Sequence, residues 1–168
     1  MEFWGQVVSV AAMVAMILSF QCKSNMKLTM VMGMGALLFA LSYLMLGQPS
    51  AALFNIVAVI CSLVCMKEKL KNRLVFFGVA LLYIIATCLA FDNWWTIVLM
   101  SAQIATSYSL MFRSGKFIRN LRLFYASPIW LINNIVFCFT IGGIVCETIT
   151  VISIIISFVR YRKTGFEK

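Results

Sequence analysis

The chain alternates long apolar runs with short loops, and its basic residues occupy only every second loop. Each apolar run is close to the length that about 30 Å of hydrocarbon requires of a helix, and the runs cover residues 3–20, 28–46, 51–66, 74–91, 95–112, 123–139 and 144–159. All fourteen lysines and arginines follow the first, third, fifth or seventh run. By the positive-inside rule, this alternation predicts seven transmembrane helices with the N-terminus outside and the C-terminus in the cytoplasm. The four basic groups are Lys23 and Lys27; Lys67, Lys69, Lys71 and Arg73; Arg113, Lys116, Arg119 and Arg122; and Arg160, Arg162, Lys163 and Lys168.

The composition also indicates an all-α protein whose solvent is lipid. Hydrophobic residues make up 63% of the chain and charged residues 11%, with a mean hydropathy of +1.01, which leaves too little polar surface for a soluble domain. The net charge of +9 lies in short loops next to apolar runs, where cations face the anionic inner leaflet. The predicted partner of these cations is therefore the lipid bilayer, and nucleic-acid binding is excluded.

Cysteine and histidine usage argues against an enzyme and against a metal site. The chain has six cysteines and no histidine, so the usual general base is missing. Cys61 and Cys65 share a helix face, but a structural zinc ion needs about four ligands. No nucleophile beside a base, no phosphate-binding glycine loop and no paired carboxylates occur in the sequence. We therefore predict no enzymatic activity, no cofactor and no metal.

The two halves of the chain share a spacing. A shift of about 92 residues lays residues 20–24 on residues 112–116 and Asn55 on Glu147. It also matches runs one to three with runs five to seven. This predicts a single transmembrane domain over residues 1–168 in a 3+1+3 arrangement: one repeat at about 3–66, a linker helix at about 74–91, and a parallel repeat at about 95–160. Parallel repeats build transporters whose site lies near the bilayer midplane between the halves.

The sixth run contains the clearest candidate for such a site. Trp130 lies near the middle of the run, where an interfacial aromatic belt does not explain it, and Asn133 and Asn134 follow within the same helix. The two asparagines point about 100° apart, so at least one faces protein or a cavity. The alternative is that Asn134 bonds a neighbouring helix while Trp130 fills the core.

Glu147 is the one acidic residue within a run, and an ionisable group inside a membrane is a functional candidate by default. It lies at a depth similar to that of the two asparagines, so a contact between them is feasible. The alternative is that Glu147 reaches the outer interface or caps the start of the seventh helix. Asn55 and Gln103 complete the candidate lining, although either residue can equally form a bond between helices.

Pro128, two residues before Trp130, interrupts the hydrogen bonding of its helix. We expect it to kink the helix, either as a hinge or as a static bend.

Several strings resemble the YgjV-type bacterial inner membrane proteins over nearly the whole chain. In the second half these strings are Trp130-x-x-Asn133-Asn134, Thr140-Ile141-Gly142-Gly143, Glu147, Arg160-x-Arg162-Lys163 and Gly165; in the first half they are Phe20-Gln21, the stretch from Phe39 to Gly47, and Asn55. The resemblance implies a location in the bacterial inner membrane. It also implies an architecture similar to the sugar-transporting SWEET and nicotinamide riboside-transporting PnuC proteins, with Asn55, Trp130 and Asn134 at a central cavity.

The chain departs from these patterns at two positions. No proline precedes Gln103, which argues against SWEET-like gating. Ala58 stands where an arginine is expected after Asn55, so Glu147 is predicted to lack an obvious cationic partner.

The sequence thus favours a transporter of a small polar solute with Trp130, Asn133, Asn134, Asn55, Gln103 and Glu147 at the site. The second hypothesis is a non-transporting membrane interaction protein, in which these polar residues only join helices. A homo-oligomer is compatible with either hypothesis.

Overall fold

In the computed structural model, residues 2–67, 70–137 and 141–160 are described, apart from the side chains of Glu2 and Ile141. The elements in this part of the chain are helical. They are α1 (Glu2–Gln21), α2 (Asn25–Met45), α3 (Pro49–Cys65), α4 (Arg73–Leu89), α5 (Trp94–Phe112), α6 (Gly115–Leu121), η2 (Arg122–Ala126), α7 (Ser127–Ile132), η3 (Asn133–Phe137) and α8 (Ile141–Arg160). The elements α6, η2, α7 and η3 follow one another without a gap, and we call this continuous rod, residues 115–137, the π-containing helix.

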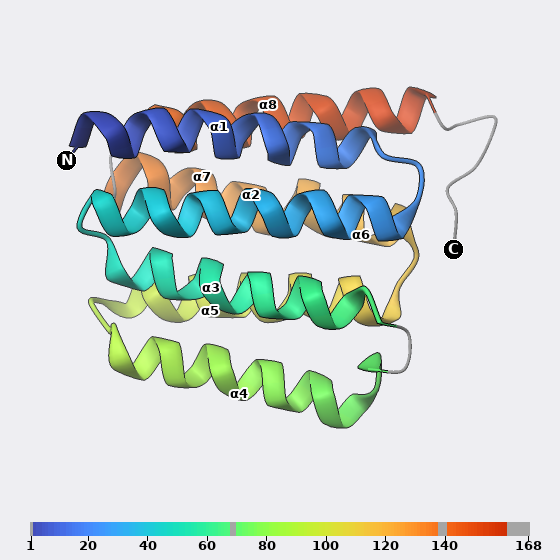
Figure 1. Ribbon diagram of the computed structural model, residues 1–168, viewed down its shortest axis with the longest axis horizontal. Coiled ribbons are helices and arrows are strands. Elements are labelled where there is room, and N and C mark those ends of the chain that lie inside the picture. Colours follow the sequence, from blue (N-terminus) through green and yellow to red (C-terminus); the bar gives the residue numbers. More distant parts are fainter. Residues whose placement is uncertain (1, 68–69, 138–140, 161–168) are drawn as a thin grey trace.

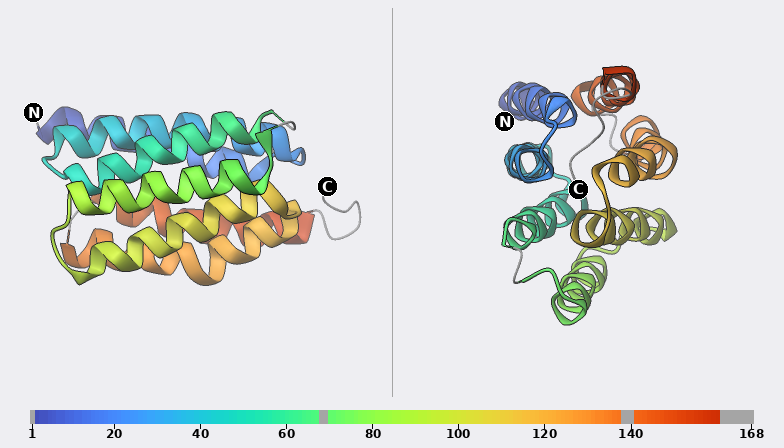
Figure 2. Two further views of the ribbon diagram at one scale, coloured as in Figure 1. Left: turned by 90° about the horizontal axis from the view of Figure 1, so that it is seen from below. Right: turned by 90° about the vertical axis from the view of Figure 1, so that its right-hand side faces the viewer.

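The helical rods lie side by side and reverse direction at each short turn (Figure 1). Seen along the bundle, α1, α2 and α3 form one column, and α8, α7 and α5 form the facing column (Figure 2). The columns close on one another because α1 contacts α8 and α3 contacts α5. The remaining helix, α4, packs against α3 and α5 at one edge. This arrangement encloses a space between the two columns.

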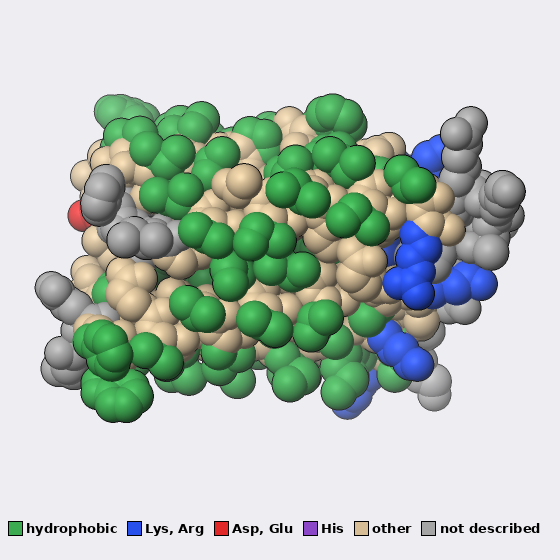
Figure 3. Space-filling model, turned by 90° about the horizontal axis from the view of Figure 1, so that it is seen from above, with side chains coloured by type: hydrophobic (Ala, Val, Ile, Leu, Met, Phe, Trp, Pro, Cys, Tyr) green, Lys and Arg blue, Asp and Glu red, His purple; other side chains and the backbone are tan. Residues whose placement is uncertain are grey.

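The flanks of the bundle are apolar and its interior is partly polar. Three helices of the described chain have both the length and the hydropathy to cross a membrane, and they run over Phe3–Gln21, Asn25–Met45 and Gly142–Arg160. The apolar helices α3 and α4 are shorter. Large hydrophobic side chains such as Leu74 and Phe124 point outward, and Figure 3 shows hydrophobic groups along the face over α1 and α8. Such a surface suits lipid rather than water.

Basic side chains are exposed at one end of the molecule (Figure 3), but Arg119 and Arg122 are buried instead. Both were expected in the loop after the fifth run, and that assignment is wrong. The π-containing helix begins at Gly115 rather than near residue 123, because Ser114 and Gly115 provide its first turn and the basic segment continues it. The helix therefore carries both guanidinium groups into the interior, where Arg119 and Arg122 are buried.

Gly142 and Gly143, which were expected in an outer loop at residues 140–143, belong to a helix instead. Helix α8 begins at Ile141, so Gly142 and Gly143 belong to its first turn, while residues 138–140 lie outside the described chain. Both glycines permit close packing. A Cβ atom on Gly142 would collide with the Ser9 hydroxyl, and one on Gly143 would lie 2.6 Å from Cγ of Asn134. The two glycines thus seat α8 against α1 and against the π-containing helix.

Candidate functional site

A cavity of about 40 Å³ lies between the two columns of helices. Each helical rod of the described bundle contributes to its lining, from Met16 on α1 to Glu147 on α8. A water molecule needs at least about 10 to 15 Å³ of such volume, so the cavity has room for about three waters. Pockets that hold drug-sized ligands measure roughly 300 to 1,000 Å³. In this arrangement, therefore, the cavity accommodates water or a very small solute.

The structure brings five of the six predicted site residues to this cavity. Asn55, Gln103, Trp130, Asn134 and Glu147 line it together, although they come from α3, α5, the π-containing helix and α8. The sixth residue, Asn133, is buried but is not among the residues that line the cavity. Binding of a solute by these residues stays a prediction.

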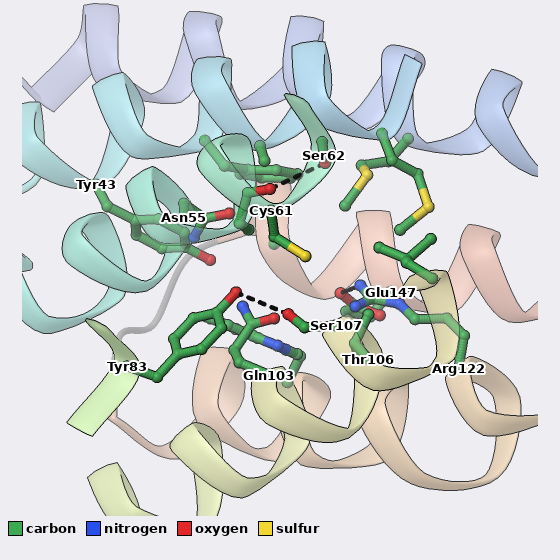
Figure 4. Close-up of a pocket in the computed structure, with 18 of the residues that line it drawn as sticks. Tyr43, Asn55, Cys61, Ser62, Tyr83, Gln103, Thr106, Ser107, Arg122 and Glu147 are labelled. Atoms are coloured by element: carbon green, nitrogen blue, oxygen red, sulfur yellow. Dashed lines mark hydrogen bonds and ion pairs between the residues drawn. The ribbon is translucent and has the colours of Figure 1, made fainter. Parts of the chain in front are cut away.

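The charged side chains that line the cavity, Arg122 and Glu147, form an ion pair. Nη2 of Arg122 donates to Oε1 of Glu147 at 2.6 Å, and the two side chains are only 7% and 8% exposed. Figure 4 shows the two side chains meeting at the cavity, Arg122 from the π-containing helix and Glu147 from the neighbouring helix α8. The expectation that Glu147 lacks a cationic partner is therefore wrong. Its partner, Arg122, comes from the π-containing helix rather than from the position after Asn55.

The ion pair is only half of the bidentate arrangement that arginine and carboxylate frequently form. Nε of Arg122, on the same edge of the guanidinium as Nη2, is buried without a hydrogen-bond partner, and so is Oε2 of Glu147. The hydroxyl of Ser127, which faces the same carboxylate, is also buried and unpaired. A buried polar atom without a partner costs about 1 to 3 kcal/mol. A water molecule or a solute group that forms hydrogen bonds with these atoms would therefore remove this cost.

Aromatic rings form a ladder along another wall of the cavity. Tyr43 stacks on Phe39 with ring centroids 5.9 Å apart and on Trp130 with centroids 6.3 Å apart. The Tyr43 hydroxyl donates to Oδ1 of Asn134 at 3.0 Å. This bond between α2 and the π-containing helix supports the alternative in which Asn134 joins helices, while Trp130 still contributes to the lining.

Near the middle of α5, the cavity wall carries a carboxamide without a hydrogen bond. Gln103 is 6% exposed and makes no hydrogen bond within the described chain. By contrast, Nδ2 of Asn55 donates to the backbone oxygen of Ala51 on its own helix. Gln103 therefore does not act as a bond between helices here, and its amide is available to the cavity (Figure 4).

The segment around Pro128 departs from regular α-helix on both sides. Residues Arg122–Ala126 and Asn133–Phe137 are π-helical, and the N–H of Ser127 donates to the oxygen of Arg122, five residues earlier. Proline has no N–H for the usual bond, and the wider turn before it accommodates that loss. Single π turns inside α-helices frequently occur at functional sites. The role of Pro128 as a hinge stays a prediction.

Sequence reasoning missed several polar residues of the lining, namely Arg122, Tyr43, Tyr83, Ser62, Thr106 and Ser107. Arg122 carried a signal that was not used. Arg119, Arg122, Ala126, Trp130 and Asn134 follow one another at spacings of three or four, which places them on one stripe of a continuous helix. The tyrosines gave no such signal, since tyrosine is also common at membrane interfaces.

The described residues contain no group of three histidine, cysteine or acidic side chains that could hold a metal ion. The two thiols of Cys61 and Cys65 lie 3.9 Å apart on α3, and Cys61 lines the cavity. Two sulfur ligands on one helix turn do not complete a zinc site.

The fold and the cavity define a multi-pass helical membrane protein with a polar, charge-paired interior. Residues 3–165 match the family model Imp-YgjV, described as a bacterial inner membrane protein. The chain therefore belongs to the Imp-YgjV family of the bacterial inner membrane, which confirms both the predicted family and the predicted location. No curated protein and no solved structure matches the chain.

Proposed function

We propose that the chain spans the membrane seven times, as two parallel three-helix repeats joined by α4, and that it moves a small polar solute through the central cavity. A twofold rotation along the bundle would exchange α1 with α5, α2 with the π-containing helix, and α3 with α8. The contacts support this relation, since each neighbouring pair in one column has its counterpart in the other, and the α3–α5 contact corresponds to the α8–α1 contact. Helix α4 stays outside the exchange (Figure 2).

The observation that carries the transport proposal is a buried, hydrogen-bonding cavity lined by both repeats. Ionisable groups inside a membrane bundle are costly, and they commonly mark substrate or ion pathways. Here an arginine, a glutamate and an unbonded glutamine meet at one cavity between the columns. Transporters with parallel repeats expose such a midplane site to each side in turn as one repeat moves against the other.

In this mechanism each residue has a separate task. The Trp130 ring offers a flat apolar wall, and Gln103 supplies a donor and an acceptor. The Arg122–Glu147 pair provides further hydrogen-bonding atoms without adding net charge to the membrane interior. Because the cavity now accommodates about three waters, a solute enters only when the columns separate. Because π turns lie on both sides of Pro128, we expect the π-containing helix to be the element that bends.

The topology predicts the outcome of reporter fusions. A reporter fused after Lys168 is expected to read cytoplasmic, and one inserted between Asp92 and Asn93 is expected to read external, because basic loops stay inside. Alkaline phosphatase and green fluorescent protein fusions measure the two outcomes. An external reading after Lys168 would contradict the seven-span proposal.

If a solute binds in the cavity, removing the aromatic wall formed by Trp130 is expected to weaken that binding. In a panel of metabolites screened by thermal shift on the purified protein, at least one solute is expected to raise the unfolding temperature of the parent. Trp130→Ala is expected to weaken that binding by about tenfold, since loss of a stacking and burial surface costs roughly 1.5 kcal/mol. Trp94→Ala is the matched control, because Trp94 is exposed at a helix end, away from the cavity.

The metabolite panel, together with an uptake assay in proteoliposomes, decides between the two functional hypotheses. In a non-transporting interaction protein the cavity would hold only water, no metabolite would stabilise the parent, and proteoliposomes would show no solute uptake above empty vesicles. That combination of results would remove the transport proposal and favour the interaction protein.

A further inference from the structure

We propose that the central cavity selects an uncharged solute whose groups both donate and accept hydrogen bonds, such as a carboxamide or a hydroxyl. In this proposal Gln103 and the open edge of the Arg122–Glu147 pair make the contacts. The inference rests on the proposed transport function and names its substrate class.

The first argument is the charge of the lining. The ionisable pair that lines the cavity is one arginine and one glutamate, and they are joined to each other at 2.6 Å. The lining therefore adds no net charge. An ion entering this low-dielectric space would lose its hydration without gaining a free counter-charge. An uncharged solute avoids that cost.

The second argument is the set of hydrogen-bonding atoms that have no partner. Nε of Arg122 is a free donor and Oε2 of Glu147 is a free acceptor, and both belong to the same ion pair. The carboxamide of Gln103 adds an NH₂ donor group and a carbonyl acceptor. A group that accepts from Nε while donating to Oε2 completes the pair. A carboxamide or a hydroxyl does this, whereas a carboxylate only accepts and an ammonium only donates.

The third argument separates uncharged solutes from zwitterions, which also have no net charge. A zwitterion gains two ion pairs in this cavity only by separating Arg122 from Glu147, whose side chains are more than nine-tenths buried. Once separated, each buried charge is left without its partner, which is strongly unfavourable. The uncharged solute leaves the existing bond between Nη2 and Oε1 in place and uses only the free atoms.

The test compares four probes that share a three-carbon skeleton: propionamide, propionate, n-propylammonium and the zwitterion β-alanine. Binding of each probe to the purified full-length protein in lipid nanodiscs is measured at pH 7 by titration calorimetry. Propionamide is expected to bind about tenfold more tightly than any of the three charged probes. Gln103→Leu removes the carboxamide contacts and is expected to weaken propionamide binding, while the control Gln6→Leu, outside the cavity, is expected to leave that binding unchanged.

Charge variants provide a second readout. Glu147→Gln leaves the Arg122 charge unbalanced and is expected to shift the preference toward propionate, while Arg122→Gln is expected to shift it toward n-propylammonium. Should a single variant fail to fold, the neutral pair Arg122→Gln with Glu147→Gln is expected to keep the preference for propionamide.

The outcomes separate this inference from the transport proposal. Preference for propionamide together with the two opposite shifts supports the substrate class. Tighter binding of a charged probe by the parent, sensitive to Gln103→Leu, overturns the substrate class but leaves a solute site. Binding of none of the probes overturns the substrate class as well, and the metabolite panel and the uptake assay then decide the transport proposal independently.

Discussion

Arg122→Met is expected to destabilise the protein by about 3 to 5 kcal/mol. The substitution removes one partner of a buried ion pair and leaves the Glu147 carboxylate, 8% exposed, without a counter-charge. Breaking a buried pair from one side costs roughly this amount, because the remaining charge keeps its desolvation penalty and loses its compensation. Tryptophan fluorescence during thermal or denaturant unfolding in detergent micelles measures the loss.

The double variant Arg122→Met with Glu147→Leu provides the sharper comparison. Replacing a whole buried pair with apolar residues of similar volume is often neutral or stabilising, so the double variant is expected to recover most of the lost stability. The coupling between the two sites then follows from a double-mutant cycle. Lys116→Met serves as the control, since Lys116 is exposed on the same helix, and its effect is expected to stay within about 0.5 kcal/mol. Additive losses in the double variant would contradict the pairing.

The helices were predictable from the sequence because crossing a membrane imposes a one-dimensional requirement. An apolar run of sufficient length and a basic loop on alternate sides can each be recognised without knowledge of packing. The same requirement explains why Asn55, Gln103, Asn134 and Glu147 were predicted as site candidates. A polar group within an apolar run is conspicuous, since the membrane offers it no water.

The ion pair was not predictable by the same reasoning. A basic residue that follows an apolar run can lie in a loop or in the first turns of the next helix, and hydropathy favours the loop. Arg122 belongs to the helix because that helix begins at Gly115, seven residues before it, within a strongly basic segment. The choice depends on the tertiary partner, Glu147, and a one-dimensional pattern does not contain that contact.

Tyr43 illustrates a second limit of sequence reasoning. It stands two residues before the end of α2, where a tyrosine is typical of the membrane interface. In the structure its ring is buried against Trp130 and its hydroxyl binds Asn134. Its inward orientation results from the close packing of α2 against its neighbours. Residue type and position alone did not distinguish this orientation from an outward one.

Arg119 joins three parts of the chain at the end of the bundle where the basic side chains gather. The Arg119 side chain is fully buried, at 0% exposure. Its Nη2 donates to the backbone oxygens of Phe20 at 3.2 Å and Cys22 at 2.8 Å, its Nη1 to the oxygen of Gly115, and its Nε to the hydroxyl of Ser157. The last carbonyls of a helix have no partner within it, so the guanidinium caps α1 and connects it to α6 and α8.

Arg119→Met is therefore expected to cost about 3 kcal/mol or more, because the backbone oxygens of Phe20 and Cys22 lose a charged donor and a buried void replaces the guanidinium. Arg119→Lys is expected to restore only part of the stability, since a single ammonium does not span acceptors that the planar guanidinium reaches together. Arg73→Met, at the exposed start of α4, is the control. Denaturant unfolding measures the free energies, and hydrogen exchange is expected to rise first at the end of α1, near Gln21. Uniform exchange along all helices, or a loss no greater than that of Arg73→Met, would show that Arg119 does not hold the helix ends together.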